Sequence, residues 1–214
     1  MIATSTAPAG MAEPVSPSDS GPSATDSRDW SYAVTASPLG PLLIAASSRG
    51  LIRVAFESEN HALVLETVSA ALGAAPLRRP RRLLDTARRQ LDEYFARRRQ
   101  SIALPLDLSL SAPFQRRVQD HLPLIEYGHT ANYPQLARLV GSPKTVLAVD
   151  VACATNSLPI VLPCHRVHRL DGALGGYPGG LEAKAALIML ESEVAAGRGH
   201  LLGTLPADHG STAA

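Results

Sequence analysis

The sequence predicts an α/β unit followed by a helical unit, both within a folded body that spans residues 30–202. Near its start, short apolar runs separated by turn residues indicate a β-meander. Apolar residues at helical spacing follow these runs, and beyond Pro105 and Pro113 helical spacing dominates the chain. We therefore expect one domain over residues 30–108 and a second over residues 109–202.

The predicted meander has one strand in each apolar run. The strands span residues 31–36, 41–46 and 51–56. Ser37-Pro38-Leu39-Gly40 separates the first two strands and Arg49-Gly50 separates the last two, and these residue types favour tight turns. Each strand can therefore pair with the next one as a hairpin.

Two helices are predicted after the meander, over residues 61–72 and over about residues 81–98. The second has an apolar face, which consists of Leu84, Ala87, Leu91, Tyr94 and Phe95. Its opposite face carries the arginines Arg82, Arg88 and Arg89. We interpret these arginines as a solvated helix face, and contact with phosphate groups is the alternative. Residues 103–108 then form a short strand or a linker.

The second unit contains the outline of a helix-turn-helix. A first helix is predicted from the spacing of Phe114, Val118, Leu122 and Ile125, and it ends before Gly128. Residues 134–140 and 144–155 predict two further helices, which Gly141-Ser142-Pro143 joins. Many helical hairpins share this outline, so the pattern alone does not establish DNA binding.

Composition narrows the class of protein. The formal charge of +1 argues against capture of nucleic acid by bulk charge, although a local basic face remains compatible with it. No apolar run is long enough for a membrane span, and the N-terminus lacks the pattern of a secretory signal. The two cysteines are too few for a disulfide framework or a structural zinc site, so we expect no metal, no cofactor and a reducing, cytoplasmic setting. Residues 1–29 and 203–214 are dominated by small and polar residues, which predicts disordered ends.

The most informative segment is Pro163-Cys164-His165-Arg166-Val167, which follows the apolar run of residues 158–162. A cysteine in such a place is often a small buried hydrophobe. Metal binding is a second interpretation, but no CxxC motif and no second histidine at ligand spacing supports it. A third interpretation is a nucleophile, because a neighbouring imidazole that a carboxylate orients can remove the thiol proton. His165 is adjacent in sequence, and Glu191 ends an apolar helical pattern that can fold back onto it.

These residues resemble the O6-alkylguanine-DNA alkyltransferases, and the resemblance covers nearly the whole folded body. In the second unit it is carried by the PCHRV motif at residues 163–167 and by Gly172, Leu174, Gly176-Tyr177, Gly179-Gly180-Leu181, Lys184 and Glu191. The helix-turn-helix matches at Tyr133, Leu136-Ala137, Gly141-Ser142-Pro143-Lys144 and Asn156. The first unit and the linker match at Ser37-Pro38-Leu39-Gly40, Leu91-Asp92-Glu93-Tyr94-Phe95, Leu104-Pro105-Leu106-Asp107-Leu108 and Phe114-Gln115. The similarity implies an N-terminal ribonuclease-H-like α/β domain and a C-terminal helical domain that carries the active site.

The resemblance also implies a chemistry. Cys164 would accept the alkyl group from O6 of guanine as a thiolate, His165 would relay the thiol proton through a water molecule, and Glu191 would hold the imidazole. Because the substrate base cannot be reached inside a duplex, it would be flipped out. The thioether product has no easy leaving route, so each protein molecule would react once.

Further roles follow from the same resemblance. Tyr177 would donate a hydrogen bond to the base and help guanine to leave as a neutral species. Lys184 would polarise the thiol or the carbonyl groups near it. Asn156 would be the hinge between the DNA-reading helix and a strand that carries the cysteine. The residues expected to contact the substrate base or the DNA are Tyr133, Leu147, Asp150, Val151, Arg166, Gly179 and Gly180.

The DNA-reading helix departs from the family pattern. Leu147 stands where the family carries an arginine that enters the base stack in place of the extruded base. A leucine can wedge a base step but cannot make the polar contacts of a guanidinium. Asp150 and Val151 stand where small glycines are usual, and the carboxylate would repel phosphates. Outside this helix, Gln119 replaces a usual tryptophan.

Three functions are compatible with a retained acceptor site and an altered DNA-facing helix. The first is repair of O6-alkylguanine or O4-alkylthymine in DNA by a monomer with a weakened grip on DNA. The second is a cysteine acceptor that uses a free alkylated base or a small alkyl donor. The third is a damage sensor without chemistry, which is disfavoured because such sensors in this family lack the cysteine that Cys164 supplies. Cys153, on the DNA-reading helix, is interpreted as a packing residue.

Overall fold

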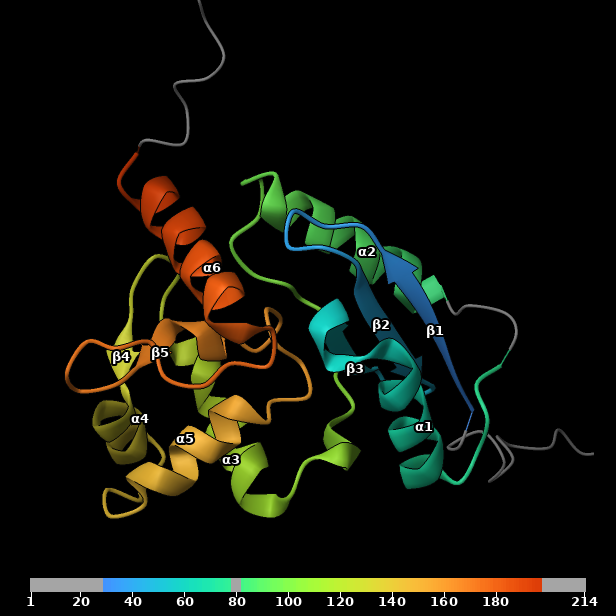
Figure 1. Ribbon diagram of the computed structural model, residues 1–214, viewed down its shortest axis with the longest axis horizontal. Coiled ribbons are helices and arrows are strands. Elements are labelled where there is room, and N and C mark those ends of the chain that lie inside the picture. The colour runs from blue at the N-terminus through green and yellow to red at the C-terminus, as the bar shows by residue number, and fades with distance from the viewer. Residues whose placement is uncertain (1–28, 78–81, 198–214) are drawn as a thin grey trace, which may run out of the picture.

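The computed structural model describes residues 29–77 and 82–197. They form a small antiparallel sheet with a helix on each face and, beside it, a group of short helices (Figure 1). The expected disordered ends, residues 1–29 and 203–214, fall outside the described residues except for Asp29. Within the two described ranges, no helix is long and apolar enough to cross a membrane.

The sheet is the predicted meander. Its strands are β1 (Trp30–Thr35), β2 (Leu42–Ser47) and β3 (Leu51–Phe56). They pair antiparallel in the order β1-β2-β3. The flanking helices are α1 (His61–Leu72) and α2 (Arg82–Phe95). Leu43 and Ala45 pack on the side of α1, whereas Leu42 and Ile44 pack on the side of α2, so β2 is apolar on both faces.

Three features of the first unit bear on the prediction. The arginines at positions 82, 88 and 89 are exposed, as a solvated helix face requires. Helix α2 ends before the predicted boundary because Arg97 adopts a left-handed conformation, with φ of 62°. Residues 103–107 form a linker that an isolated parallel bridge between Leu106 and Leu51 holds to the sheet, with the Leu51 N–H donating to the Pro105 carbonyl at 2.8 Å, and Leu108 begins a 3₁₀ turn. Gly50 permits this approach, because a Cβ there would lie 2.5 Å from the Pro105 oxygen.

The second unit is built from short helices. They are α3 (Pro113–His121), α4 (Tyr133–Leu139), α5 (Val146–Ala154) and α6 (Gly180–Ala195). Single 3₁₀ turns occur in this unit at η4 (Leu122–Leu124) and η5 (Cys164–Arg166), at the boundary of the two units at η3 (Leu108–Leu110), and in the first unit at η2 (Glu57–Glu59). A short parallel pair, β4 (Ala131–Asn132) with β5 (Val167–His168), ties the start of α4 to the segment that follows Cys164. Helices α4 and α5 form the predicted helix-turn-helix.

Three predicted elements differ from the structure. The first helix of this unit stops at His121, because Pro123 has no N–H to continue the hydrogen-bond ladder. Helix α5 begins at Val146 because Thr145 closes a turn onto the Ser142 carbonyl. The apolar run of residues 158–162 is buried as expected but forms turns, with φ of 71° at Ile160. The prediction of a strand that carries the cysteine is therefore wrong, and Cys164 lies on η5.

Candidate active site

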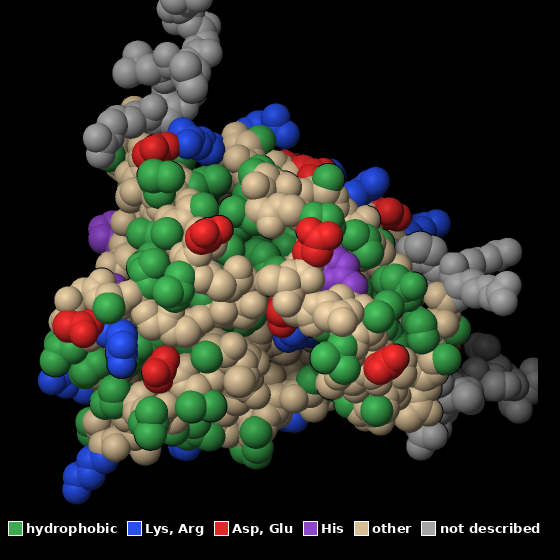
Figure 2. Space-filling model, in the orientation of Figure 1, with side chains coloured by type: hydrophobic (Ala, Val, Ile, Leu, Met, Phe, Trp, Pro, Cys, Tyr) green, Lys and Arg blue, Asp and Glu red, His purple; other side chains and the backbone are tan. Residues whose placement is uncertain are grey.

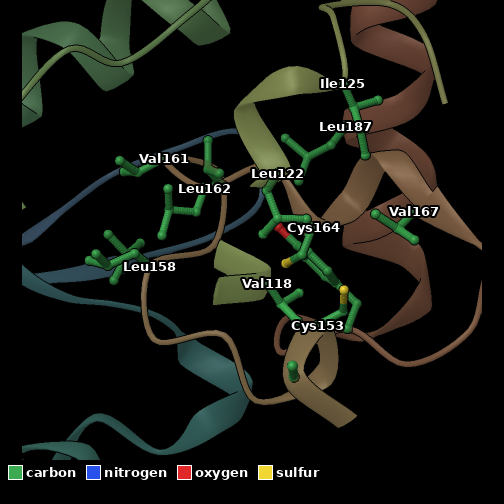
Figure 3. Packing of buried hydrophobic residues seen from close by; sticks show 14 of the residues in the cluster. Val118, Leu122, Ile125, Cys153, Leu158, Val161, Leu162, Cys164, Val167 and Leu187 are labelled. Atoms are coloured by element: carbon green, nitrogen blue, oxygen red, sulfur yellow. The ribbon is translucent and has the colours of Figure 1, made fainter. Parts of the chain in front are cut away.

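Cys164 lies inside a cluster of apolar side chains from α3, α5 and the turns before η5 (Figure 3). It is fully buried. Burial raises the pKa of the Cys164 thiol to about 11, while the hydrogen bond from Asn156 and the positive charge of Lys184 act in the opposite direction. The thiol therefore holds its proton at neutral pH until a base removes it.

Glu191, on α6, is the buried acceptor of five hydrogen bonds. Arg166 donates to both of its oxygens, from Nε to Oε2 at 2.8 Å and from Nη2 to Oε1 at 3.0 Å. Tyr94, from α2 of the first unit, donates its hydroxyl to Oε1 at 2.7 Å. Burial raises the pKa of Glu191, but hydrogen bonds from His165 and Arg166 and their charges outweigh it and hold the pKa at about 2. The carboxylate is therefore ionised at neutral pH.

His165 is oriented by this carboxylate. Its Nε2 lies 2.9 Å from Glu191 Oε1, and the side chain is fully buried. Because an ionised carboxylate only accepts, Nε2 carries the proton in the neutral imidazole. Burial lowers the pKa of His165, against the opposing influence of Glu191, and so favours that neutral form. Within the described part of the chain Nδ1 has no hydrogen-bond partner, so its lone pair is free to act as a base.

Two further polar side chains face the thiol. Asn156 is fully buried, and its Nδ2 donates to Cys164 Sγ at 3.1 Å and to the Leu162 carbonyl at 2.9 Å. Lys184 is buried on α6, and its Nζ donates to the carbonyls of Leu174 and Gly176. Burial lowers the pKa of Lys184, whereas the nearby Cys164 raises it. An amide donor and a cation thus both favour a negative charge on the sulfur.

The segment before α6 supplies one wall of the site. Tyr177 packs edge-on against Phe56 and His165, with ring centroids 5.6 and 6.3 Å apart respectively. Its hydroxyl is buried, and no partner for it exists among the described residues, which leaves it free to donate. A Cβ on Gly179 would lie 2.7 Å from the Phe56 ring, so the glycine allows this close packing. Gly180 follows with φ of +83° and begins α6.

Of the residues expected to contact the base or the DNA, Tyr133 and Arg166 are buried in the protein. Tyr133 is buried at the start of α4, and Lys184 Nζ lies 5.8 Å from its ring centroid. Arg166 is also buried, and its guanidinium bonds Glu191 and, at 2.6 Å, the Ile125 carbonyl. Its donors are therefore engaged within the protein, which does not support the expected contact with DNA.

Two of the altered positions of α5 lie on its outer face, where Leu147 is 77% exposed and Val151 is 54% exposed. Asp150 is partly buried, and its charge acts on Tyr133, Cys153 and Lys184. Leu147 and Val151 line an open groove of about 640 Å³ whose walls are mostly apolar, Phe114 among them. On the face drawn in Figure 2, basic side chains do not gather into one continuous patch. Cys153 is fully buried on the inner face of α5, in agreement with a packing role.

Sequence reasoning missed three contributors to the site. Tyr94 was expected only as part of an apolar helix face, Gly128 only as a helix terminator, and Gln119 only as a departure from the family. The detectable signal was a polar group on a predicted buried face, because such a group needs an internal hydrogen-bond partner. Tyr94 and Gln119 both satisfy that description.

Comparison with known proteins agrees with the fold and with the PCHRV segment. Residues 31–108 match the ribonuclease-like domain of 6-O-methylguanine DNA methyltransferase, and residues 113–193 match its DNA binding domain. The constitutive methylated-DNA–protein-cysteine methyltransferase of Bacillus subtilis is 39% identical over 161 residues, which are 75% of this chain and 94% of that protein. The bifunctional transcriptional activator/DNA repair enzyme Ada of Escherichia coli is 37% identical over 164 residues, 76% of this chain, but the match spans only 45% of Ada.

Solved structures give the same result. The crystal structure of the Mycobacterium tuberculosis O6-methylguanine methyltransferase superposes with a TM-score of 0.65 at 32% identity, over 77% of this chain and 93% of that one. A crystal structure described as M. tuberculosis OGT in complex with DNA superposes with a TM-score of 0.62 at 32% identity, over the same shares of the two chains. The chain therefore belongs to the 6-O-methylguanine DNA methyltransferase family.

Proposed function

We propose that the protein repairs DNA by moving an alkyl group from O6 of guanine, or from O4 of thymine, onto its own Cys164. The observation that carries this proposal is a buried thiol next to a neutral histidine whose Nε2 is fixed by an ionised carboxylate and whose Nδ1 is free. The named activity of the B. subtilis relative, a methylated-DNA–protein-cysteine methyltransferase, supports it.

The transfer begins with removal of the thiol proton. His165 takes this proton on Nδ1 through a water molecule, and Glu191 stabilises the imidazolium that forms. Asn156 and Lys184 favour the thiolate, which attacks the alkyl carbon. The carbon–oxygen bond breaks, its electron pair stays on the base, and a thioether forms. The Tyr177 hydroxyl donates a hydrogen bond to the base, and the base leaves as a neutral species by taking up one proton, which balances the proton that the thiol lost to His165.

Duplex DNA that contains an alkylated base is the proposed partner, and α5 is the element that meets it. The exposed Leu147 is an apolar wedge for the base step that flipping opens. We also propose that the protein acts as a monomer. The family matches end at residue 108 and restart at residue 113, which supports the division into domains 30–108 and 109–202.

A free alkylated base needs no contact with α5, so it is a useful second substrate in the laboratory. Transfer from a free base reports on the thiol and its neighbours alone. Transfer from a duplex reports on these residues and on the outer face of α5 together.

Intact-mass spectrometry tests the acceptor. Incubation with duplex DNA that contains O6-methylguanine should add the mass of one methyl group, peptide mapping should place it on Cys164, and the reaction should stop after one equivalent. Cys164→Ala should show no adduct, whereas the matched variant Cys153→Ala should still react. An adduct on Cys153, or turnover beyond one equivalent, would overturn the proposal.

A further inference from the structure

Gln119 forms a second layer behind the residues that touch the thiol. It is fully buried near the end of α3. Its Nε2 donates to Asn156 Oδ1 at 3.0 Å, and Asn156 Nδ2 in turn lies 3.1 Å from Cys164 Sγ. The three side chains form a chain of hydrogen bonds that runs from the core of the helical domain to the sulfur.

The backbone fixes the direction of this chain. The Leu158 N–H donates to Asn156 Oδ1 at 3.0 Å, and the Leu162 carbonyl accepts from Asn156 Nδ2 at 2.9 Å. If the amide were reversed, its NH₂ group would face the Leu158 N–H and its oxygen would face the Leu162 carbonyl, so neither hydrogen bond could form. The Asn156 oxygen therefore faces Gln119, and its N–H groups face the Leu162 carbonyl and the sulfur.

We propose that Gln119 is a positioning residue for alkyl transfer, because its N–H, together with the Leu158 N–H, holds the Asn156 amide in the orientation that donates to Cys164 Sγ. This inference rests on the proposed function, since it takes Cys164 as the acceptor. A donor directed at the sulfur stabilises the thiolate more than the thiol, so the hydrogen bond favours the reactive form. An Asn156 oxygen that accepts two hydrogen bonds also polarises the amide and strengthens its N–H groups as donors.

Other titratable and charged groups face the thiol from each element packed around it. They are Lys184 on α6, Glu59 on η2, Tyr133 on α4, Cys153 on α5, and Tyr177 in the segment before α6. His165 is adjacent to Cys164 and is paired with Glu191. None of these groups touches Gln119 through a hydrogen bond given by the structure, so a change at position 119 reaches the thiol through Asn156.

The burial of Gln119 separates this role from a purely structural one. Its Oε1 is buried, and in the described ranges no protein group donates to it. An unsatisfied buried acceptor lowers stability, so an apolar side chain of the same length would suit the core at least as well. After such a change Asn156 Oδ1 still accepts from Leu158. A positioning role therefore predicts a loss of reactivity without a loss of stability.

Gln119→Met tests this prediction, because methionine keeps the length of the side chain and removes its N–H. The full chain is mixed with free O6-benzylguanine between about pH 6 and pH 10, and the rate of adduct formation on Cys164 is followed by mass. We expect the rate near pH 7 to fall about 3- to 10-fold. Because the whole range lies below the Cys164 pKa of about 11, the rate should fall by nearly the same factor throughout it, and the melting temperature should be unchanged or higher.

Gln90→Met is the matched control. Gln90 is a buried glutamine on α2 whose hydrogen bonds within residues 29–77 and 82–197 are to the backbone of Ala103, so its replacement should leave the pH profile unchanged. Gln119→Leu serves as a second variant if the Gln119→Met protein does not fold. Equal pH profiles for wild type and a folded Gln119 variant, or an equal slowing by Gln90→Met, would overturn the role of Gln119. A wild-type protein without an adduct on Cys164 would instead overturn the proposed function itself.

Discussion

Replacement of Glu191 by glutamine removes the charge at the centre of the buried network. The wild-type carboxylate accepts hydrogen bonds from Tyr94, Gly128, His165 and Arg166. Glutamine preserves the volume but turns one acceptor into a donor, and it leaves the guanidinium of Arg166 without its counter-charge. Removal of one partner from a buried ion pair costs about 3–5 kcal/mol, and we expect the free energy of unfolding at pH 7 to fall by that amount.

The same substitution should remove part of the acid sensitivity of the fold. The pKa of Glu191 is about 2 in the folded protein, against 4.5 for an unperturbed glutamate. Because the folded state favours the ionised form, the contribution is fully present above about pH 4.5 and is lost as the pH falls toward 2. The gap between the two values corresponds to about 3 kcal/mol at pH 7. About 2 kcal/mol of this is lost by pH 3.

Urea unfolding followed by circular dichroism at pH 7, 5 and 3 measures both effects. The difference in unfolding free energy between wild type and Glu191→Gln should shrink by about 2 kcal/mol from pH 7 to pH 3. Glu66→Gln is the control, because Glu66 is exposed on α1 and far in sequence from the site. A difference that stays constant with pH, or an equal change in Glu66→Gln, would refute the assignment of this acid sensitivity to Glu191.

Two other substitutions test the contacts on either side of the site. Tyr94→Phe removes the hydroxyl that donates to Glu191, so the rate of alkyl transfer should fall and the free energy of unfolding should drop by about 1–2 kcal/mol. Adduct formation measures the first effect and thermal melting the second, and no change in either would contradict the contact. Leu147→Arg combined with Asp150→Gly should raise affinity for an alkylated duplex at least about tenfold in gel shifts at fixed salt, with little change in transfer from free O6-benzylguanine. Leu63→Arg, at an exposed position of α1, controls for added charge, and an equal gain there would show that the position on α5 is unimportant.

The sheet was predictable from the sequence because its signals are local. Each predicted hairpin turn contains glycine between two short apolar runs, and the observed strands lie within a residue of those runs. The run of residues 158–162 gave a weaker signal, since burial alone does not distinguish a strand from a buried turn. The conformation of Ile160 and the hydrogen bond from Leu162 N–H to the Leu158 carbonyl make this segment a turn.

The site was predictable only where the chemistry is carried by a motif. Cys164, His165 and Glu191 are arranged as the PCHRV segment indicated, with Glu191 against the imidazole. Tyr94 lies 97 residues before Glu191 in the chain, and only the docking of the two units brings them together. Arginine is usually a surface residue, and Arg166 is buried because it pairs with Glu191, a contact that the sequence analysis did not predict.

The two faces of α5 allow the thiol site and the proposed DNA contact to change separately. Val149 and Cys153 are fully buried on the inner face, in the cluster that encloses Cys164. Leu147 and Val151 are exposed on the outer face, and the structure gives neither of them a hydrogen bond to the thiol site. Because the thiol contacts only the inner face, the outer face can change without disturbing the groups that ionise the sulfur. Under the proposal that α5 meets DNA, Leu147 bears on how firmly a duplex is held, and the reactivity of the buried cysteine is set independently of it.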